Sequence, residues 1–409
     1  MGSGVVRRLY RAAFKMPRGL AGAQEHSRSC MSSGLTALAA QSKSRAASHS
    51  TPVIHPTPSP SVAIIGAGLS GALCAQQLSQ AGWRVEVFDK SRGVGGRMAT
   101  RRVGFMGPDG VDQVALFDHG APAFDWPESS PVGKSWLHHA RAAGVIAPWV
   151  TSVPSDEPAG SMAWVPTPDM PALCRWLLQG QVVKTLCTID GLQRSGRGWS
   201  LTPSGQTAGE GFDAMVVAIP PAQAALLLSP HRSDWAQQAQ HQSMSPCWTL
   251  MAVSDAPEGP EGNRPGQAPM AASPYPHPFA SAAASSQSPL AMVIRQDTKP
   301  GRSGLPRGMA SWVAHASQSW TQAHLEEAPE AILPLLQAAL QEALGAELRW
   351  HHAAVHRWRY AQFEGAAQAT QCLWDQDLAL GVCGDAWGGG GVWGASESAL
   401  ALCAMMLRR

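Results

Sequence analysis

Three closely spaced glycines near residue 66 are the first residues whose type and spacing suggest chemistry. The segment 66–71 has the sequence Gly-Ala-Gly-Leu-Ser-Gly, between an apolar run at 62–65 and helix-forming residues at 70–80. The first glycine permits a tight turn, the second lets the backbone approach a pyrophosphate, and the third lets the helix pack closely on the strand. Phosphate would then be held by the free N–H groups at the helix N-terminus. The residues expected at this phosphate site are Gly66, Gly68, Leu69, Ser70 and Gly71.

An acidic residue, Asp89, follows a second predicted strand at 84–88, eighteen residues after the third glycine. A carboxylate at this position hydrogen-bonds a ribose hydroxyl and repels a 2′-phosphate. The βαβ unit therefore predicts a dinucleotide site that disfavours NADP, and it does not separate NAD from FAD. The alternative is a structural glycine turn with a surface aspartate.

Two further glycine-rich segments accompany the first. Residues 90–97 (Lys-Ser-Arg-Gly-Val-Gly-Gly-Arg) hold paired glycines and Arg97, which could bind a pyrophosphate through two parallel hydrogen bonds. Near the C-terminus, a predicted strand at 378–383 leads through Gly384 and Asp385 and a glycine run into a helix predicted at 395–407. The alternative for both segments is an ordinary glycine loop.

The amino-acid sequences of these segments resemble those of one protein family. Residues 88–101 resemble the second phosphate motif of the flavin amine oxidase superfamily, and in particular its renalase-like branch. Residues 117–121 (Phe-Asp-His-Gly-Ala) resemble the turn that lies against the flavin ring in that branch. The resemblance extends from residue 62 to the C-terminus, except for 254–290, and includes the stretches 212–223, 297–301, 312–319 and 356–362.

The resemblance implies bound FAD. It implies that the Gly-Asp pair holds the ribityl chain and pyrophosphate, and that the next helix directs its N-terminus at the N1–O2 edge of the flavin. Attachment is expected to be non-covalent, because Cys383 lies in the last strand and Cys403 deep in the final helix. The additional cofactor-binding residues expected are Asp89, Lys90, Gly95, Gly96, Arg97, His119, Gly120, Ala121, Gly384, Asp385, Val392 and Trp393. The chain departs from the branch at Gly93, Pro122, Gly391 and Trp393.

No catalytic residue follows from the sequence, but three are candidates. His119 would lie beside the flavin, where a structural role is favoured because hydride transfer often needs no protein base. Trp358 and Tyr360 share one face of a predicted strand and could flank a planar ring, with core packing as the alternative. The eight cysteines lie far apart without a C-x-x-C pair, so no metal site is expected.

The predicted fold class is α/β, with a Rossmann-like FAD/NAD(P)-binding domain and a mainly antiparallel β substrate domain, as in amine oxidases and renalases. The FAD domain is expected to be discontinuous, from 60–125, 168–235 and 376–409. The substrate domain is expected from 126–167 and 236–375, with a low-complexity loop at 254–290 and an amphipathic helix at 325–344.

The N-terminal extension accounts for the positive net charge of the chain. The net charge is +2, but eight of the 31 Lys and Arg residues and only one of the 29 Asp and Glu residues lie in residues 1–60. The rest of the chain is therefore acidic, which removes the support for a nucleic-acid partner. The extension itself is expected to be disordered, an organelle-targeting segment or the result of an upstream start codon, so the cytoplasm is favoured and organelle import is the alternative. No apolar run is long enough to predict a membrane span.

Renalase resemblance implies oxidation of a reduced nicotinamide-like substrate, such as a dihydronicotinamide nucleotide, or of another small molecule. Hydride would pass to the flavin, with dioxygen as the acceptor. The rival enzymes are a flavin amine oxidase and a desaturase. A rival from another class is a non-catalytic FAD-binding sensor or interaction module. The sequence assigns no oligomeric state.

Overall fold

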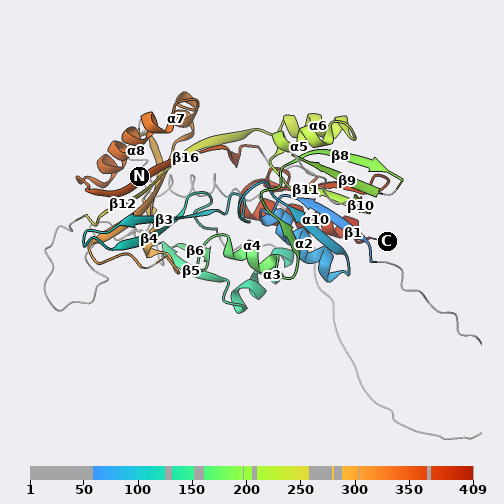
Figure 1. Ribbon diagram of the computed structural model, residues 1–409, viewed down its shortest axis with the longest axis horizontal. Helices are drawn as coiled ribbons and strands as arrows, with labels where there is room; N and C mark the ends of the chain where they lie inside the picture. The colour runs from blue at the N-terminus through green and yellow to red at the C-terminus, as the bar shows by residue number, and fades with distance from the viewer. Residues whose placement is uncertain are drawn as a thin grey trace, which may run out of the picture.

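The structure is a computed structural model that describes residues 59–124, 131–151, 161–196, 198–204, 210–257, 279–280, 288–302, 304–365 and 370–408. The predicted extension lies outside the described residues up to residue 58, as does most of the predicted 254–290 loop. Two β-sheets with their covering helices lie side by side along the longest axis (Figure 1). None of the helices in the described part is long and apolar enough to cross a bilayer.

The first sheet has six strands in the order β17-β18-β11-β1-β2-β7. Their bounds are β1 Ser61–Ile65, β2 Arg84–Phe88, β7 Val182–Lys184, β11 Ala214–Val217, β17 Leu373–Asp375 and β18 Leu380–Val382. All neighbours are parallel except β17, which runs antiparallel to β18. Strands β1 and β11 are buried along their full length, as expected for parallel strands covered on both faces.

Two layers cover this sheet. Helices on one face share a core with alternate strand residues such as Val62 and Ile64; they are α2 Leu69–Gln80, α3 Pro131–Ala142, α4 Ala172–Leu177 and α10 Gly391–Met406. The other face, with Ala63 and Ile65, is covered by two helices and a three-stranded sheet. These elements are α5 Pro221–Leu228, α6 Ser233–Gln240, β8 Ile189–Ser195, β9 Gly198–Pro203 and β10 Glu210–Phe212.

The second sheet has five antiparallel strands in the order β13-β14-β15-β12-β16. Their bounds are β12 Met244–Asp255, β13 Phe279–Ala280, β14 Leu290–Arg295, β15 Met309–Ala316 and β16 Trp350–Phe363. Helix α8, Pro329–Leu344, packs on one face, and α7, Gln318–Ala323, contacts β12. Hairpins β3–β4 and β5–β6 contribute to the core on the opposite face; their strands are β3 Thr100–Met106, β4 Asp112–Asp118, β5 Ile146–Thr151 and β6 Ser161–Pro166. A 3-10 turn, Gln296–Thr298, follows β14.

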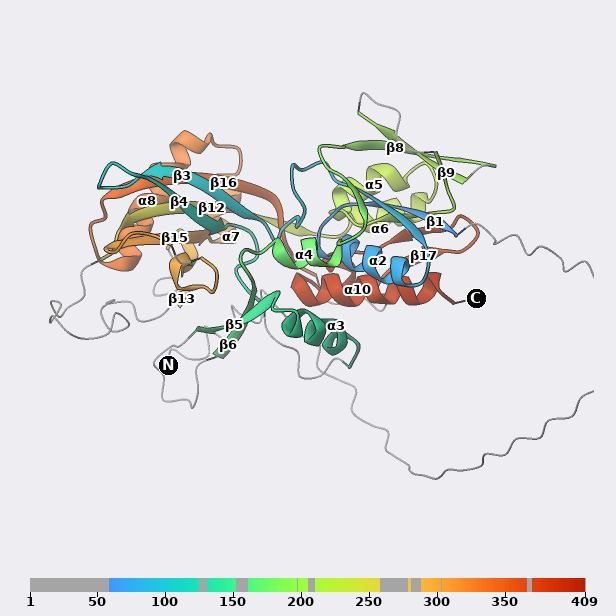
Figure 2. The same ribbon diagram turned by 60° about the horizontal axis from the view of Figure 1, so that its bottom comes forward.

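The packing crosses the expected domain boundaries at two segments. Helix α3, expected in the substrate domain, places Trp136 and Leu137 in the core of the six-stranded sheet. The β3–β4 hairpin, expected in the FAD domain, places Phe105 and Phe117 in the core of the five-stranded sheet, which it overlies in Figure 2. The chain therefore passes between the two halves more often than the sequence suggests.

Two predicted helices begin at different residues in the structure. Helix α8 begins at Pro329 rather than 325, because proline suits the first turn of a helix. It ends at Leu344, and the next residue, Gly345, is left-handed (φ 62°) and caps it. Helix α10 begins at Gly391, four residues before its predicted start. The preceding Gly389 and Gly390 have φ of 95° and 96°, and they turn the chain tightly enough for α10 to begin at once.

Candidate functional site

One cavity of about 1950 Å³ receives residues from both halves of the molecule. Its lining includes most of the residues predicted from sequence: Gly66, Gly68, Leu69, Ser70, Asp89, Lys90, Gly95, Gly96, Arg97, His119, Gly120, Ala121, Trp358, Tyr360, Gly384, Asp385 and Val392. Gly71 and Trp393 are not part of the lining. Segments that are far apart in sequence thus meet around one space.

The three glycines of the first turn have different steric reasons to be glycine. A Cβ atom on Gly66 would lie 2.4 Å from the Ala218 carbonyl oxygen, and one on Gly71 would lie 1.9 Å from the Gly66 carbonyl oxygen. Gly68 is different, because its Cβ would meet only the Gly96 Cα atom, at 4.0 Å. Its backbone is extended (φ −74°, ψ −176°), which any residue adopts. Packing and backbone conformation therefore explain Gly66 and Gly71, whereas at Gly68 they leave an open space facing the cavity.

Asp89 lies at the end of β2 and lines the cavity, with 9% of its surface exposed. Its Oδ2 accepts a hydrogen bond from the Ala67 amide (2.7 Å), and its Oδ1 accepts one from the Ser91 amide (2.8 Å). A carboxylate oxygen has two lone pairs, so each oxygen can accept a further bond from a ligand hydroxyl. Asp89 therefore fixes the glycine turn as well as presenting an acceptor to the cavity.

The second glycine segment lies directly against the first. Gly95 donates to the Ala67 carbonyl (2.9 Å), and Gly95 and Gly96 have φ of 117° and 55°. The turn predicted to face the flavin is fixed to the same segment, since the Ala121 amide donates to the Arg97 carbonyl at 2.8 Å. Backbone hydrogen bonds thus hold the two phosphate segments and the 119–121 turn as one unit.

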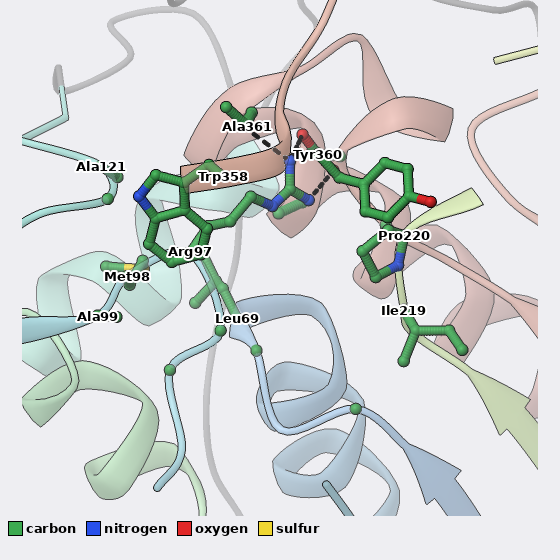
Figure 3. A pocket seen from close by; sticks show the side chains of 18 of the residues that line it. Leu69, Arg97, Met98, Ala99, Ala121, Ile219, Pro220, Trp358, Tyr360 and Ala361 are labelled. Atoms are coloured by element: carbon green, nitrogen blue, oxygen red, sulfur yellow. Dashed lines mark hydrogen bonds and ion pairs between the residues drawn. The ribbon is translucent and has the colours of Figure 1, made fainter. Parts of the chain in front are cut away.

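Arg97 and Asp385 form an ion pair that sequence reasoning did not anticipate. Arg97 Nη1 donates to Asp385 Oδ2 at 2.7 Å, Nη2 donates to Oδ1, and Nη1 also lies 3.4 Å from the Ala361 carbonyl oxygen. The side chains are 30% and 6% exposed. Figure 3 shows the Arg97 guanidinium between Trp358 and Tyr360. Both charged residues line the cavity as expected, but each already has a partner of opposite charge.

Trp393 lies on the first turn of α10 and packs toward α3. Its ring centroid is 6.4 Å from that of Trp136, and it contacts the core of the six-stranded sheet. The turn before α10 packs tightly on the helix, since a Cβ on Gly388 would lie 2.0 Å from the Gly394 carbonyl oxygen. Trp393 is thus not among the residues that line the cavity, whereas its neighbour Val392 is.

Three histidines and a tryptophan form one side of the cavity, termed here the histidine wall: His119, His315, His356 and Trp358. His315 on β15 and His356 on β16 are both paired in register with Thr249 on β12. Opposite residues in neighbouring strands point to the same face of a sheet. His119 follows β4, and its ring centroid lies 5.0 Å from that of His356 and 5.2 Å from that of Trp358. The Trp358 indole also donates to the His119 carbonyl at 2.8 Å.

These imidazoles are held in the neutral form. Burial, reinforced by nearby His356, lowers the pKa of His119 to about 4, and burial lowers the pKa of His356 to about 4 and that of His315 to about 3. Arg101 also lowers the pKa of both His119 and His356. His315 Nδ1 lies 3.3 Å from Thr249 Oγ1, while its Nε2 is buried with no hydrogen-bond partner in the described part of the chain. At neutral pH the wall offers uncharged donors and acceptors.

A buried charge cluster supports the turn that carries His119. The Asp118 carboxylate is fully buried and accepts hydrogen bonds from Thr100 Oγ1 (2.6 Å), Lys299 Nζ (3.0 Å) and Arg302 Nε (3.1 Å). Lys299 also donates to the Pro122 carbonyl at 2.7 Å. The two cations lower the pKa of Asp118 against the opposing effect of burial, and burial lowers that of Lys299 to about 8. Two cations therefore share one carboxylate directly beneath residues 119–122.

Sequence reasoning identified His119 and Trp358 but missed His315 and His356. Alternation along β16 could have revealed His356, because it is two residues before Trp358 and so shares its face. No local signal marks His315, which joins the wall only through strand pairing. No group of three or more His, Cys, Asp or Glu side chains arranged to hold a metal ion occurs among the residues that the structure describes.

Known proteins share this architecture. Residues 64–139 match the family model for an NAD(P)-binding Rossmann-like domain. A crystal structure of a putative protoporphyrinogen oxidase from Exiguobacterium sp. 255-15 aligns with a TM-score of 0.62 at 11% identity, covering 86% of this chain and 99% of that one. A putrescine oxidase bound to putrescine aligns with a TM-score of 0.56 at 14% identity, covering 87% and 100%. An oxidoreductase from Methanosarcina mazei aligns with a TM-score of 0.51 at 14% identity, covering 85% and 100%. These likenesses confirm the predicted fold class, a Rossmann-like domain with an antiparallel sheet domain.

Proposed function

We propose that the chain is an oxidoreductase that binds FAD non-covalently and oxidises a small, reduced, nicotinamide-like substrate, with dioxygen as the acceptor. The observation that carries the proposal is the open space beside Gly68. Neither packing nor backbone conformation requires a glycine at this position. The space lies where the N-terminus of α2, Asp89 and the second glycine segment meet. A dinucleotide pyrophosphate would occupy that space.

The residues present fit FAD. Main-chain N–H groups at the start of α2 would bind phosphate, and Asp89 would accept from a ribose hydroxyl. Gly384 lines the same cavity and would lie beside the ribityl chain, as the family resemblance implies. Cys383 and Cys403 are buried outside the cavity lining, so neither of these two thiols reaches a flavin bound in the cavity. Bound FAD would supply a two-electron acceptor for hydride. The finer assignment to a renalase-like substrate rests on the sequence resemblance of residues 88–101 and 117–121.

Spectroscopy of the purified protein tests the proposal. A visible flavin spectrum is expected, with anaerobic bleaching by isomeric dihydronicotinamide nucleotides and recovery on admission of air with formation of peroxide. Bleaching by simple amines alone would instead identify an amine oxidase, and bleaching only by an apolar substrate would identify a desaturase. A bound flavin that no reductant bleaches would identify a sensor or interaction module.

A matched pair of variants tests the placement of the cofactor. Gly68→Val is expected to fold, because its backbone is extended and its Cβ has room, yet to lose FAD because the side chain fills the phosphate space. The control is Gly104→Val, an exposed position on β3 outside the cavity lining, where the nearest atom to a Cβ is 3.9 Å away. Full FAD loading of Gly68→Val, measured by absorbance against protein concentration, would refute the placement.

A further inference from the structure

The cavity end formed by the histidine wall carries positive charge without matching negative charge. Arg101 on β3 lines the cavity and is half-buried, and within the described residues it has no carboxylate partner. Behind the wall, Lys299 and Arg302 are fully buried and share the single carboxylate of Asp118. The three imidazoles add no compensating charge, because they are neutral at physiological pH.

The carboxylates that line the cavity in the described part have other partners. They are Asp89 and Asp385 at the glycine segments, Asp169 paired with Arg175, Asp190 bonded to Ser204, and Glu364 bonded to Gln318 and Ser243. Glu364 is eight residues beyond His356, roughly 26 Å along an extended strand. The acid next to the wall, Asp118, is already outnumbered by Lys299 and Arg302, so an ammonium group there would meet the positive charge of Arg101 without a balancing carboxylate.

We infer that the histidine wall and Arg101 bind an anionic group, a carboxylate or a phosphate, carried by a planar substrate. The guanidinium of Arg101 would form charge-assisted hydrogen bonds with such a group. Among the residues that the structure describes, the buried Nε2 of His315 has no hydrogen-bond partner. The rings of Trp358 and His119 are inclined by 30° and offer flat surfaces for a planar body. This inference deepens the proposed function, since it names the substrate class of the same cavity.

Calorimetry with three small probes that share a phenyl ring tests the inference. Benzoate and phenyl phosphate carry an anion, and benzylamine carries a cation at pH 7.5. At least one anion is expected to bind at least tenfold more tightly than benzylamine, and the tighter of the two identifies the preferred group. Arg101→Gln should weaken the binding of that anion about tenfold, and Arg101→Lys should weaken it less than Arg101→Gln does. Arg349→Gln removes a positive charge at an exposed position outside the lining and should leave binding unchanged.

Benzylamine binding as tightly as the better anion would overturn the inference, as would failure of both anions to bind. Anion binding that Arg101→Gln leaves unchanged, in a variant whose Tm equals that of the parent, would also overturn it. Calorimetry does not depend on bound flavin, and the part of the binding that is lost in Arg101→Gln reports the wall rather than the glycine segments. A protein that binds the anions but never FAD would therefore refute the proposed function and leave the anion site standing.

Discussion

The neutral histidines predict a specific acid sensitivity. An unfolded histidine has a pKa of about 6.5, whereas burial lowers the pKa to about 4 for His119 and His356 and to about 3 for His315. Between these values the unfolded chain binds more protons than the folded chain. The free energy of unfolding therefore falls as the pH falls from about 6.5 toward 4, and it is fully retained above 6.5.

The magnitude follows from the number of protons. At pH 5.5 each unfolded histidine binds nearly one proton and each folded one binds almost none, so each contributes about 1.4 kcal/mol per pH unit. The three together give a slope of about 4 kcal/mol per pH unit. This slope is large beside a typical total stability of about 5–15 kcal/mol. The range between pH 5.2 and 6.5 isolates the effect, because most carboxylates titrate at lower pH.

His315→Gln tests this explanation. The substitution keeps a polar side chain at the wall but removes one titrating group, so the average slope between pH 5.5 and 6.5 should fall by about 0.7 proton, or about 1 kcal/mol per pH unit. Urea unfolding at pH 5.5, 6.0 and 6.5 would give the slope. His241→Gln removes an exposed histidine at the end of α6 and serves as the control. An unchanged slope in His315→Gln, or a flat pH dependence in the parent, would refute the assignment.

Three further predictions concern substitutions of charged residues. Asp89→Ala is expected to weaken FAD binding. It should also lower the free energy of unfolding of the FAD-free protein by about 1–3 kcal/mol, since two backbone amides lose their acceptor. An unchanged Tm of the FAD-free protein would contradict this. Asp118→Asn is expected to lower the free energy of unfolding by about 3–5 kcal/mol, and by more than Lys299→Met does, because it leaves two buried cations without their carboxylate. Urea unfolding would rank the two variants, and the reverse order would contradict this explanation. Arg97→Gln is expected to lower the free energy of unfolding by about 1–3 kcal/mol, because it leaves the Asp385 carboxylate unpaired, and Arg97→Lys should lower it less. Equal Tm values for both variants and the parent would contradict this prediction.

Local patterns predicted the parts of the site that depend on local structure. The βαβ unit and its glycines could be identified because a tight turn and a close helix–strand contact each require glycine at a fixed position. Gly66 and Gly71 meet backbone atoms at the predicted contacts. Asp89 lines the cavity for the same reason, since the end of β2 lies beside the turn.

The positions of other side chains depend on tertiary packing and could not be predicted from local sequence patterns. Trp393 was expected at the cofactor, but the glycine turn lets α10 begin at Gly391, and the side chain packs toward Trp136 on α3. His315 and His356 come together only because β12 pairs with both β15 and β16. Nothing in the sequence fixes that strand order, so a wall built across three strands cannot be assembled from local patterns.

The Arg97–Asp385 ion pair changes how the cavity can balance an anionic cofactor. The sequence suggested that Arg97 would neutralise a pyrophosphate, but in the structure its charge is matched by a carboxylate that is 6% exposed. The pair therefore brings no net charge to the glycine segments. Phosphate charge there would be balanced by the N-terminus of α2 and by Lys90 and Arg92, which line the cavity and are exposed.

The two ends of the cavity consequently differ in how they would attract anions. At the glycine segments, backbone amides and solvent-exposed cations supply the positive potential, and salt screens exposed charges. At the histidine wall, Arg101 is half-buried and the excess charge of Lys299 and Arg302 is fully buried, so screening is weaker. Added salt should therefore weaken cofactor binding more than binding of an anionic probe at the wall. A comparable loss at both ends would contradict this division of charge.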